Sequence, residues 1–501
     1  MATRTSALST NVDTWDVIVL GAGAVGENVA DRTAQGGLRT VIVESSLIGG
    51  ECSYWACMPS KALLRSGAVL AAARRVPGAA EAVTSAVDPR ATLQRRDTIV
   101  NGYSDAGQAN WLESAGIDLV RGHGRLTAPR EVTVTAADGS VRVLTASHAV
   151  VVSTGSAALL PEVPGLVEVA PWTSREATSA TEIPKSLAIV GGGVVAAEMA
   201  TAYTALGSHV TLVARSGLLG GSEPFAGDMV ATALRDSGAT LLLDDSPTAA
   251  RRTDTGDVEL TLASGGTVTA SEVLVATGRV PNTGGLGLAT VGLVDGDWLT
   301  VDDTLRVVGE SPASVSALGT GQPGSGWLYA AGDVNHRALL THQGKYQARA
   351  VGDVIVARAA GTAIDDKPWG SHVATADHSA VPQVTFTDPE VASVGLTAAA
   401  AVKEGYRVRI LDYDLSWLGG STVLADDYVG RARAIVDLDR EVLIGVTFVG
   451  QDVAELLHSA TIAVVAEVPI DRLWHAVPSY PTLSEVWLRL LEEYGRPGHD
   501  V

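Results

Sequence analysis

Residues 15–44 read WDVIVLGAGAVGENVADRTAQGGLRTVIVE: an apolar run, a glycine turn, a helical pattern and a second apolar run. This order predicts a strand, a helix and a second strand. The turn contains Gly21, Gly23 and Gly26. In such a turn the first glycine permits the sharp bend, the second lets a pyrophosphate approach the backbone, and the third brings the helix against the strand. The helix N-terminus would face the phosphates, and Glu44 could accept hydrogen bonds from an adenosine ribose.

The same unit occurs a second time in residues 186–215, SLAIVGGGVVAAEMATAYTALGSHVTLVAR. Gly191, Gly193 and Ala196 occupy the three turn positions. One such turn alone matches many unrelated loops, but two copies, each between an apolar run and a helical pattern, are a specific signal. The sequence therefore predicts a chain that binds two dinucleotides.

The two units differ at the end of the second strand. Where the first unit has Glu44, the second has Ala214, followed by Arg215. A carboxylate suits a ribose 2′-hydroxyl, whereas an arginine can pair with a 2′-phosphate. We therefore expect NADPH at the second site, with NADH as the alternative if Arg215 only points into solvent.

Three further apolar runs end in short glycine-containing motifs. They are HAVVVSTGS (148–156) with Thr154 and Gly155, SEVLVATGRVPN (271–282) with Gly278, and WLYAAGDV (327–334) with Asp333. The first two frame the second nucleotide unit as an insertion in the first. All three are expected to be strand ends that border the bound cofactors.

We therefore predict an α/β fold with two Rossmann-type dinucleotide-binding domains, the second inserted in the first, followed by an α+β domain. The α+β domain is expected from strand-like runs beyond residue 382 and from helical patterns near 452–466 and 483–493. The segment 306–326, rich in Ser, Gly and Pro, is expected to form a mobile surface loop. The expected domain boundaries are 13–156 with 282–360, 157–281, and 382–501.

Composition and charge narrow the class of protein. Of 501 residues, 46% are hydrophobic and 18% charged, as in a globular protein. The 36 basic and 56 acidic side chains give a net charge of −20, which argues against a nucleic-acid partner. The N-terminal residues contain no signal-peptide core, and no run reaches the roughly 18 apolar residues of a membrane span. We expect a cytoplasmic protein without a membrane partner.

The chain has only two cysteines, both in GGECSYWACMPSKALLR (49–65). A structural disulfide between Cys52 and Cys57 would close almost no loop, and a zinc site would need further cysteines, so we expect a redox-active pair and no metal. Pro59 favours the first turn of a helix. Cys57 would then lie at the helix N-terminus, where the dipole stabilises a thiolate, with Cys52 on the irregular segment before it. The pair could pass two electrons between dithiol and disulfide.

Together these motifs resemble the class I FAD-dependent pyridine nucleotide–disulfide oxidoreductases, a family that includes dihydrolipoamide dehydrogenase, glutathione reductase and mercuric reductase. The resemblance covers nearly the whole chain. It rests on both glycine turns, the two cysteines followed by Pro-Ser-Lys, and the motifs ATGRVPN, AAGDV and FTDPEVASVGLT (386–397). It implies that the first nucleotide domain binds FAD and the second NAD(P)H. It also implies a homodimer, built by residues beyond about 382, whose subunits share their active sites.

The resemblance also implies roles for single residues. Cys52 would be the interchange thiol that meets the substrate, and Cys57 the charge-transfer thiol beside the flavin. Lys61 would lie near the flavin N5 and pair with Glu198. Asp333 would bind the ribityl chain.

The C-terminal motif departs from this family. Its disulfide reductases have an acid–base histidine before a proline, and a glutamate after it. VPSYPTLSE (477–485) has Tyr480 in place of that histidine and keeps Glu485. An imidazole titrates near pH ~6.5 and a phenol near ~10, so Tyr480 is a poor base at neutral pH. The ending YPTLSE and the Trp55 between the cysteines instead resemble the soluble pyridine nucleotide transhydrogenases, which lack the second cysteine.

Neighbouring groups leave two alternatives open. His458 and His475 could replace the missing base, although such histidines are more often structural or at the surface. Tyr54 and Trp55 could form an aromatic wall for a planar substrate or could simply pack in the core. No cysteine follows residue 57, so the C-terminal cysteine pair of mercuric reductase is absent and mercury reduction is not expected.

Three hypotheses follow. In the first, an FAD-dependent NAD(P)H oxidoreductase passes hydride from nicotinamide through the flavin to the Cys52–Cys57 disulfide, and on to a disulfide or other small acceptor. In the second, Tyr480 indicates an NAD(P)H:quinone reductase or a transhydrogenase that acts directly from the flavin. In the third, the chain is the lipoamide dehydrogenase subunit of a larger complex, for which no docking motif is visible.

Overall fold

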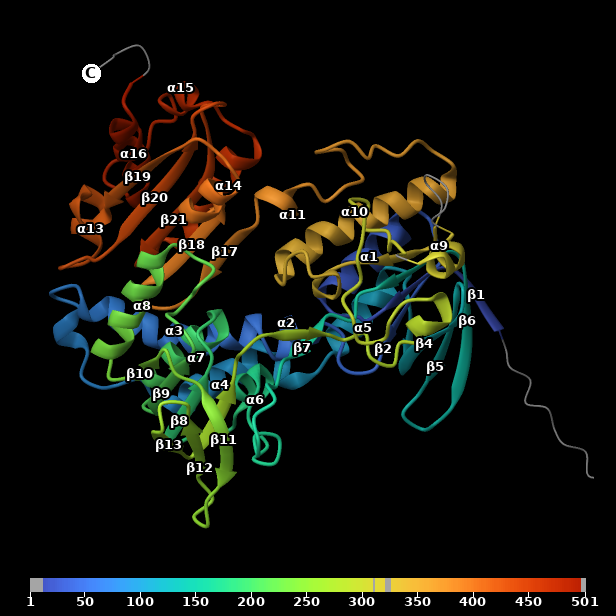
Figure 1. Ribbon diagram of the computed structural model, residues 1–501, viewed down its shortest axis with the longest axis horizontal. Helices are drawn as coiled ribbons and strands as arrows, with labels where there is room; N and C mark the ends of the chain where they lie inside the picture. Colours follow the sequence, from blue (N-terminus) through green and yellow to red (C-terminus); the bar gives the residue numbers. More distant parts are fainter. Residues whose placement is uncertain (1–11, 310, 320–325, 497–501) are drawn as a thin grey trace, which may run out of the picture. The chain divides into compact units, whose positions relative to one another are not determined.

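The structure, a computed structural model, describes residues 12–309, 311–319 and 326–496. These residues divide into two compact units (Figure 1). The first unit comprises the described residues up to Tyr54 together with Asn101–Ala157 and Arg279–Asp377; the second comprises Trp55–Val100, Ala158–Gly278 and the described residues from His378 onward. Residues 55–100 lie within the sequence range predicted for the first nucleotide domain, yet they pack in the second unit.

A seven-stranded sheet forms the centre of the first unit, in the order β3-β2-β1-β6-β5-β4 with β16 beside β6. Strands β1, β2, β3, β6 and β16 pair in parallel, and β4 and β5 add an antiparallel edge. The strands are β1 (Val12–Leu20), β2 (Thr40–Glu44), β3 (Asp118–Arg121), β4 (His123–Ala128), β5 (Glu131–Thr135), β6 (Val141–Val152) and β16 (Leu328–Ala330).

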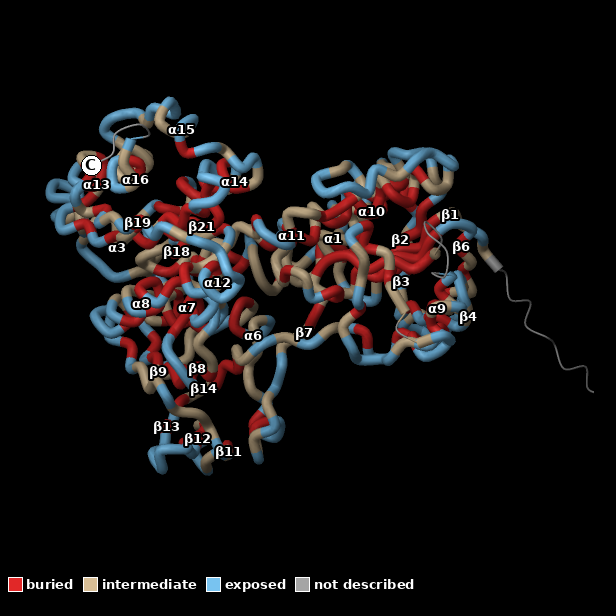
Figure 2. The backbone as a smooth tube through the Cα atoms, turned by 45° about the horizontal axis from the view of Figure 1, so that its top comes forward, coloured by how far each residue is buried: buried red, intermediate tan, exposed pale blue. Residues whose placement is uncertain are grey.

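The sheet is buried because its central strands are apolar on both faces. Val17, Ile18 and Val19 of β1 are each 0% exposed, as a covered parallel sheet requires. Helices α1 (Ala24–Gln35) and α10 (Thr341–Ala360) pack together beside it. Most of β2 and the C-terminal ends of β1 and β6 are buried (Figure 2). The first glycine turn therefore lies at the carboxyl end of a buried parallel strand, where such sheets bind ligands.

Shorter elements complete the first unit. They are α2 (Gly50–Tyr54), η2 (Asn101–Tyr103), α5 (Ala106–Ser114), β7 (Ser156–Ala158), β15 (Arg279–Pro281), η3 (Leu288–Val291), α9 (Pro312–Leu318), η4 (Asp333–Asn335) and α11 (Ala376–Ser379), the last running on into the second unit. The segment 306–326 was predicted to be a mobile surface loop. This prediction is wrong for residues 312–318, which form the helix α9. Ser311 caps this helix by accepting a hydrogen bond from the Ser314 N–H, and Leu318 is 0% exposed in the core. Residues 310 and 320–325 lie outside the described residues.

The second glycine turn belongs to a second, smaller parallel sheet, β10-β9-β8-β14, in the second unit. Helix α7 follows β8 as α1 follows β1, and α3 packs against α7 and α4. An antiparallel sheet, β11-β12-β13, lies after β10 in the chain. The elements are α3 (Cys57–Arg74), η1 (Ala80–Ala82), α4 (Pro89–Ile99), α6 (Ser174–Ser179), β8 (Ser186–Val190), α7 (Val194–Ala205), β9 (His209–Ala214), α8 (Pro224–Asp236), β10 (Thr240–Leu243), β11 (Pro247–Arg252), β12 (Val258–Leu262), β13 (Thr267–Ala270) and β14 (Glu272–Val275).

The C-terminal segment forms an antiparallel sheet, β17-β18-β21-β20-β19, with helices around it. The expected strands and both expected helices are present, and β18 is one strand that the sequence analysis did not identify. The elements are β17 (Pro382–Thr385), β18 (Glu390–Gly395), α12 (Ala398–Lys403), β19 (Val408–Asp414), η5 (Leu415–Trp417), α13 (Gly419–Leu424), β20 (Arg431–Asp437), β21 (Val442–Gly450), η6 (Ala454–Leu456), α14 (Leu457–Val465), α15 (Ile470–Leu473), η7 (Leu483–Glu485) and α16 (Val486–Tyr494).

The predicted fold class is confirmed. Two Rossmann-type domains precede an α+β segment, and in the sequence the strands of the second domain lie between β6 and β16 of the first. Among the described helices, none combines the length and apolar character needed to cross a bilayer.

Candidate functional site

The first glycine turn has the packing that its sequence predicts. Gly21 has a φ of 95°, and a Cβ there would lie 2.5 Å from the carbonyl oxygen of Ser153. A Cβ on Gly26 would overlap the carbonyl oxygen of Gly21. At Gly23, no atom of the described chain lies within 4 Å of the Cβ position. The fold therefore requires glycine at the first and third positions and leaves open space at the second, where a pyrophosphate would approach.

Two carboxyl groups border this turn. Glu44, the last residue of β2, accepts hydrogen bonds from the backbone N–H groups of Ala22 at 2.6 Å and Ser46 at 2.7 Å. Burial raises the pKa of Glu27, in the first turn of α1, to about 7; Lys345 opposes this change and Glu44 adds to it. Glu27 therefore carries only part of a negative charge at neutral pH, which reduces its repulsion of an anionic ligand at the helix N-terminus.

Asp333 lies in a polar cluster after β16. Its Oδ2 accepts a hydrogen bond from Ser156 Oγ at 2.5 Å, and Arg279 Nε lies 3.7 Å from the same oxygen. Arg279 also donates to the Ser156 carbonyl at 2.6 Å and lies 3.8 Å from Glu51. Sequence reasoning placed Asp333 at a cofactor but missed Ser156 and Arg279, although both belong to the strand-end motifs STGS and ATGRVPN.

The strand end at Thr154 contains buried hydroxyl groups. Thr154 Oγ1 and Ser153 Oγ are buried and have no hydrogen-bond partner within the described part of the chain. Gly155 follows with a φ of 71°, which favours glycine. Because buried hydroxyls are nearly always hydrogen-bonded, this strand end has the character of a ligand site.

The second glycine turn repeats the packing of the first. Gly191 has a φ of 135°, and a Cβ there would overlap the carbonyl oxygen of Ala276. No described atom lies within 4 Å of the Cβ position at Gly193, whereas Ala196 is buried in α7. Gly278 lies exposed beyond the neighbouring strand β14, with a φ of 149°. The turn again leaves room at its second position.

The end of β9 presents the residues that would distinguish the two nicotinamide nucleotides. Ala214 is 3% exposed, and the following Arg215 is exposed. No carboxylate takes the place that Glu44 has in the first unit. A cationic side chain at this strand end can pair with a 2′-phosphate.

The two cysteines lie on different elements. Cys57 is the first residue of the 18-residue helix α3, as predicted, and it is half-buried. Cys52 was expected on an irregular segment, but it lies in the short helix α2, which is part of the first unit. The sequence signal for this helix was weak because its five residues GECSY include a glycine, a cysteine and a serine, which favour helices little.

Lys61 lies one turn after Cys57 and forms the ion pair that the family resemblance implies. Its Nζ is 2.8 Å from Glu198 Oε2 and 3.1 Å from Oε1, and it lies 4.9 Å from the centre of the Phe386 ring. The Glu198 side chain, on α7, is 4% exposed and also accepts a hydrogen bond from the Phe386 N–H at 3.0 Å. A buried carboxylate is thus compensated by an ammonium group and a backbone donor.

Trp55 is half-buried and contacts residues of α6. The Arg175 guanidinium lies 3.6 Å from the centre of the Trp55 ring, and Thr178 Oγ1 donates to the Trp55 carbonyl at 2.9 Å. Tyr54 is 1% exposed. Tyr54 therefore packs in the core, whereas the half-buried Trp55 contacts Arg175, a neighbour that no sequence motif indicated.

Tyr480 and Glu485 of the C-terminal motif differ in their exposure to solvent. Tyr480 is 76% exposed, whereas Glu485 is 6% exposed and accepts a hydrogen bond from Arg489 Nη2 at 2.6 Å. His458 and His475 are exposed. The Glu485–Arg489 ion pair was not anticipated, although the i,i+4 spacing could have indicated it.

Comparison with known proteins agrees with this geometry. Residues 15–361 match the pyridine nucleotide-disulphide oxidoreductase family, and residues 381–490 match the dimerisation domain of that family. The chain therefore belongs to the pyridine nucleotide-disulphide oxidoreductases and is an enzyme of this class. Membership implies an FAD and a pyridine nucleotide as cofactors.

Relatives cover almost the whole chain. A mercuric reductase of Acidithiobacillus ferrooxidans is 32% identical over 94% of this chain and 80% of its own, and a dihydrolipoyl dehydrogenase of Chlorobaculum tepidum is 31% identical over 94% and 95%. The fold is shared with LpdA from Mycobacterium tuberculosis (TM-score 0.79, 24% identity, 96% and 100% covered). It is also shared with the HOCl-induced flavoprotein disulfide reductase RclA from Escherichia coli (TM-score 0.79, 21% identity, 96% and 99% covered).

The residues of the first unit fit FAD. The open Cβ position of Gly23 leaves room for a pyrophosphate, and the Glu44 carboxylate, which could accept from ribose hydroxyls, lies beside the same turn. Thr154 Oγ1, buried without a hydrogen-bond partner within the described ranges, could bond a ligand. Space for a pyrophosphate, a carboxylate and a buried hydroxyl group thus lie around one end of the sheet, as a dinucleotide site requires.

Proposed function

We propose that this enzyme is an NAD(P)H oxidoreductase in which Cys52 and Cys57 form a redox-active disulfide that passes electrons to a disulfide or other small acceptor. The N-terminus of α3 carries the proposal. Cys57 is its first residue, and Lys61, one turn later, is fixed by the buried Glu198. The helix dipole and the ammonium group both favour a thiolate at Cys57.

The chain's own residues would divide the remaining work. Gly23 and Glu44 would hold the diphosphate and ribose of the FAD, and Asp333 the ribityl chain. When bound, FAD supplies hydride acceptance from nicotinamide and electron transfer to sulfur. Glu198 would keep Lys61 oriented, and Lys61 would place positive charge beside the redox centre.

A spectroscopic experiment tests the cysteine assignment. Anaerobic reduction with NADPH should produce the long-wavelength absorption of a thiolate beside an oxidised flavin. Cys57→Ser should abolish this band, whereas Cys52→Ser should keep it because the remaining thiolate still lies beside the ring. Persistence of the band in Cys57→Ser would show that the assignment is wrong.

For the nicotinamide site, we propose NADPH. The support is the exposed Arg215 at the end of β9, after the buried Ala214. Arg215→Glu should shift kcat/KM from NADPH towards NADH, and Arg235→Glu, an exposed charge reversal on α8, should not. Equal nucleotide preference in wild type and Arg215→Glu would rule out the role of Arg215.

A second candidate function, direct transfer from the flavin to a quinone or a second nicotinamide, is favoured by the C-terminal motif. Tyr480 stands in the place of the family's acid–base histidine, and Glu485 Oε1 is paired with Arg489. Under this alternative a Cys52→Ser/Cys57→Ser double variant keeps full quinone reductase or transhydrogenase activity. Loss of activity towards every acceptor in the double variant would exclude it.

We further propose a cytoplasmic homodimer whose partner subunits complete each other's active sites. Support comes from the dimerisation-domain match and from the large exposed apolar side chains of that segment, such as Trp417 (74%) and Val477 (84%). Sedimentation should give a dimer, and Val477→Asp should weaken it. A monomeric wild-type enzyme with full activity would refute shared sites.

A further inference from the structure

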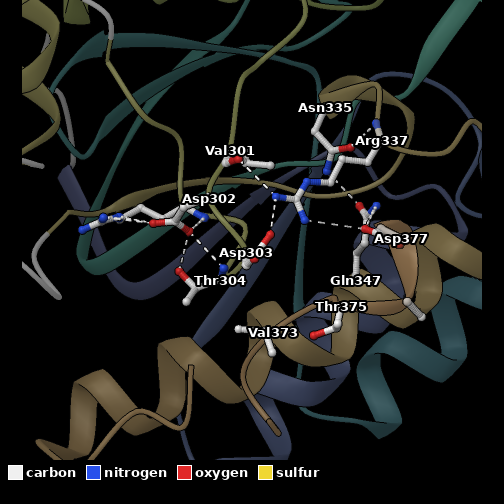
Figure 3. A network of polar contacts seen from close by, with 12 residues as sticks. Val301, Asp302, Asp303, Thr304, Asn335, Arg337, Gln347, Val373, Thr375 and Asp377 are labelled. Carbon is white, nitrogen blue, oxygen red and sulfur yellow. Dashed lines mark hydrogen bonds and ion pairs between the residues drawn. The ribbon is translucent and has the colours of Figure 1, made fainter. Parts of the chain in front are cut away.

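Buried side chains form a chain of hydrogen bonds from Asn335, after β16, through Gln347 to Asp377 (Figure 3). Gln347 Oε1 accepts hydrogen bonds from the Gly332 N–H and from Asn335 Nδ2, both at 2.8 Å. Gln347 Nε2 donates to Asp377 Oδ2 at 2.8 Å, and Gln343 Nε2 donates to Asp377 Oδ1 at 2.9 Å. The three amide side chains and Asp377 are at most 9% exposed, and Gln347 is 0% exposed.

Arg337 is a cationic neighbour of Asp377. Arg337 Nη1 lies 3.9 Å from Asp377 Oδ2, while its Nη2 donates to Asp303 at 2.9 Å. Arg337 thus lies between two carboxylates, as Figure 3 shows. A buried carboxylate is costly without such compensation, so the network depends on all its members.

The network has a fixed polarity. A carboxylate only accepts hydrogen bonds, so Asp377 requires the amide nitrogen of Gln347. The amide oxygen of Gln347 must then face Gly332, whose φ of 84° is rarely adopted by other residues. The orientation of one amide group therefore connects Asp377 with the backbone turn that carries Asp333.

We propose that Gln347 and Asp377 are positioning residues for FAD, because they fix the turn from which Asp333 would reach the ribityl chain. The inference rests on the proposed role of Asp333. Asp377 is also the last residue of the first unit, directly before the C-terminal segment. Since coupling is reciprocal, bound FAD should in turn protect the preceding linker, residues 361–376, from hydrogen exchange.

Reversing the polarity of the pair tests the proposal. Gln347→Glu sets two carboxylates face to face. Asp377→Asn leaves one amide oxygen to accept from two donors, the Nε2 groups of Gln347 and Gln343, so one of these groups must face an amide nitrogen. The double variant restores the pair with opposite polarity, because the new amide at 377 can donate to the new carboxylate at 347, which still accepts from Gly332. FAD affinity of the reconstituted protein should fall roughly ten- to hundredfold in each single variant. It should return to within about threefold of wild type in the double variant.

Matched variants separate this inference from the proposed function. Asp353→Asn removes a half-buried carboxylate of α10 that pairs with Arg32 and lies outside the network, and it should leave FAD affinity unchanged. If Asp333→Ala also leaves affinity unchanged, the proposed role of Asp333 fails. If Asp333→Ala weakens binding but the single variants do not, or if the double variant shows the sum of both losses, the positioning role alone is overturned. Should a single variant not fold, unchanged exchange of residues 361–376 on FAD removal from wild type would overturn it equally.

Discussion

Removing the cation beside Glu198 should open the contact between α3 and α7 locally. In Lys61→Met, the Glu198 carboxylate, 4% exposed, would keep the Phe386 N–H as its donor among the described residues. Breaking a buried pair from one side costs about 3–5 kcal/mol, and the 36% exposure of Lys61 places this case near the lower end, at about 3 kcal/mol. Adding Glu198→Gln removes the stranded charge while the amide oxygen still accepts from Phe386. The second substitution should therefore regain about 1–2 kcal/mol.

Hydrogen exchange measures this local opening directly. Exchange at residues 385–387 should accelerate about a hundredfold in Lys61→Met and only about tenfold in Lys61→Met/Glu198→Gln, since about 1.4 kcal/mol corresponds to a factor of ten. Lys185→Met, at an exposed lysine, is the matched control and should leave exchange unchanged. Exchange in the double variant as fast as in Lys61→Met would refute the argument, because the stranded carboxylate would then not be the cause.

Three further predictions concern other parts of the chain. The folded state favours protonated Glu27. The stabilisation from this preference is complete below pH 4.5, the ordinary pKa, and is lost as pH rises through about 7, the pKa in the folded state. In FAD-free protein, the free energy of unfolding of Glu27→Gln should therefore gain up to about 3 kcal/mol over wild type between pH 5 and 8, measured as a widening difference in Tm. Gly26→Ala should prevent stable folding, whereas Gly23→Ala should fold with a wild-type circular dichroism spectrum and retain little FAD. Tyr480→His should raise the rate of disulfide reduction only slightly, because Arg489 still pairs with Glu485. Adding Arg489→Leu should raise the rate further, and equal rates in the single and double variants would contradict an effect of this ion pair.

Sequence reasoning succeeded where function depends on local spacing. The glycine turns were predictable because each needs only a strand, three small residues and a helix in order. The position of Cys57 followed from Pro59, three residues into the helix. The Lys61–Glu198 pair, separated by 137 positions, was reached only through the family resemblance.

The remaining contacts could not be read from spacing. Asp333 is contacted by Ser156 and Arg279, which are themselves 123 positions apart in the sequence. Gln347 and Asp377 lie in the helices α10 and α11, which carry no motif, and their pairing depends on how α10 packs beside the sheet. Such networks depend on tertiary packing, which local sequence patterns do not predict.

In the proposed cycle, reduction of the cysteine pair and its reoxidation make different demands on the protein. Reduction needs a stabilised thiolate, for which the N-terminus of α3 and Lys61 are suited. Reoxidation by a disulfide also needs a group that accepts and returns a proton near neutral pH, and a phenol such as Tyr480 does this poorly. Glu485 Oε1 is paired with Arg489, which restrains this carboxylate. An acceptor that takes electrons without thiol exchange would lose less from this substitution, so the acceptor is the property in which this enzyme should differ most from its dihydrolipoyl dehydrogenase relatives.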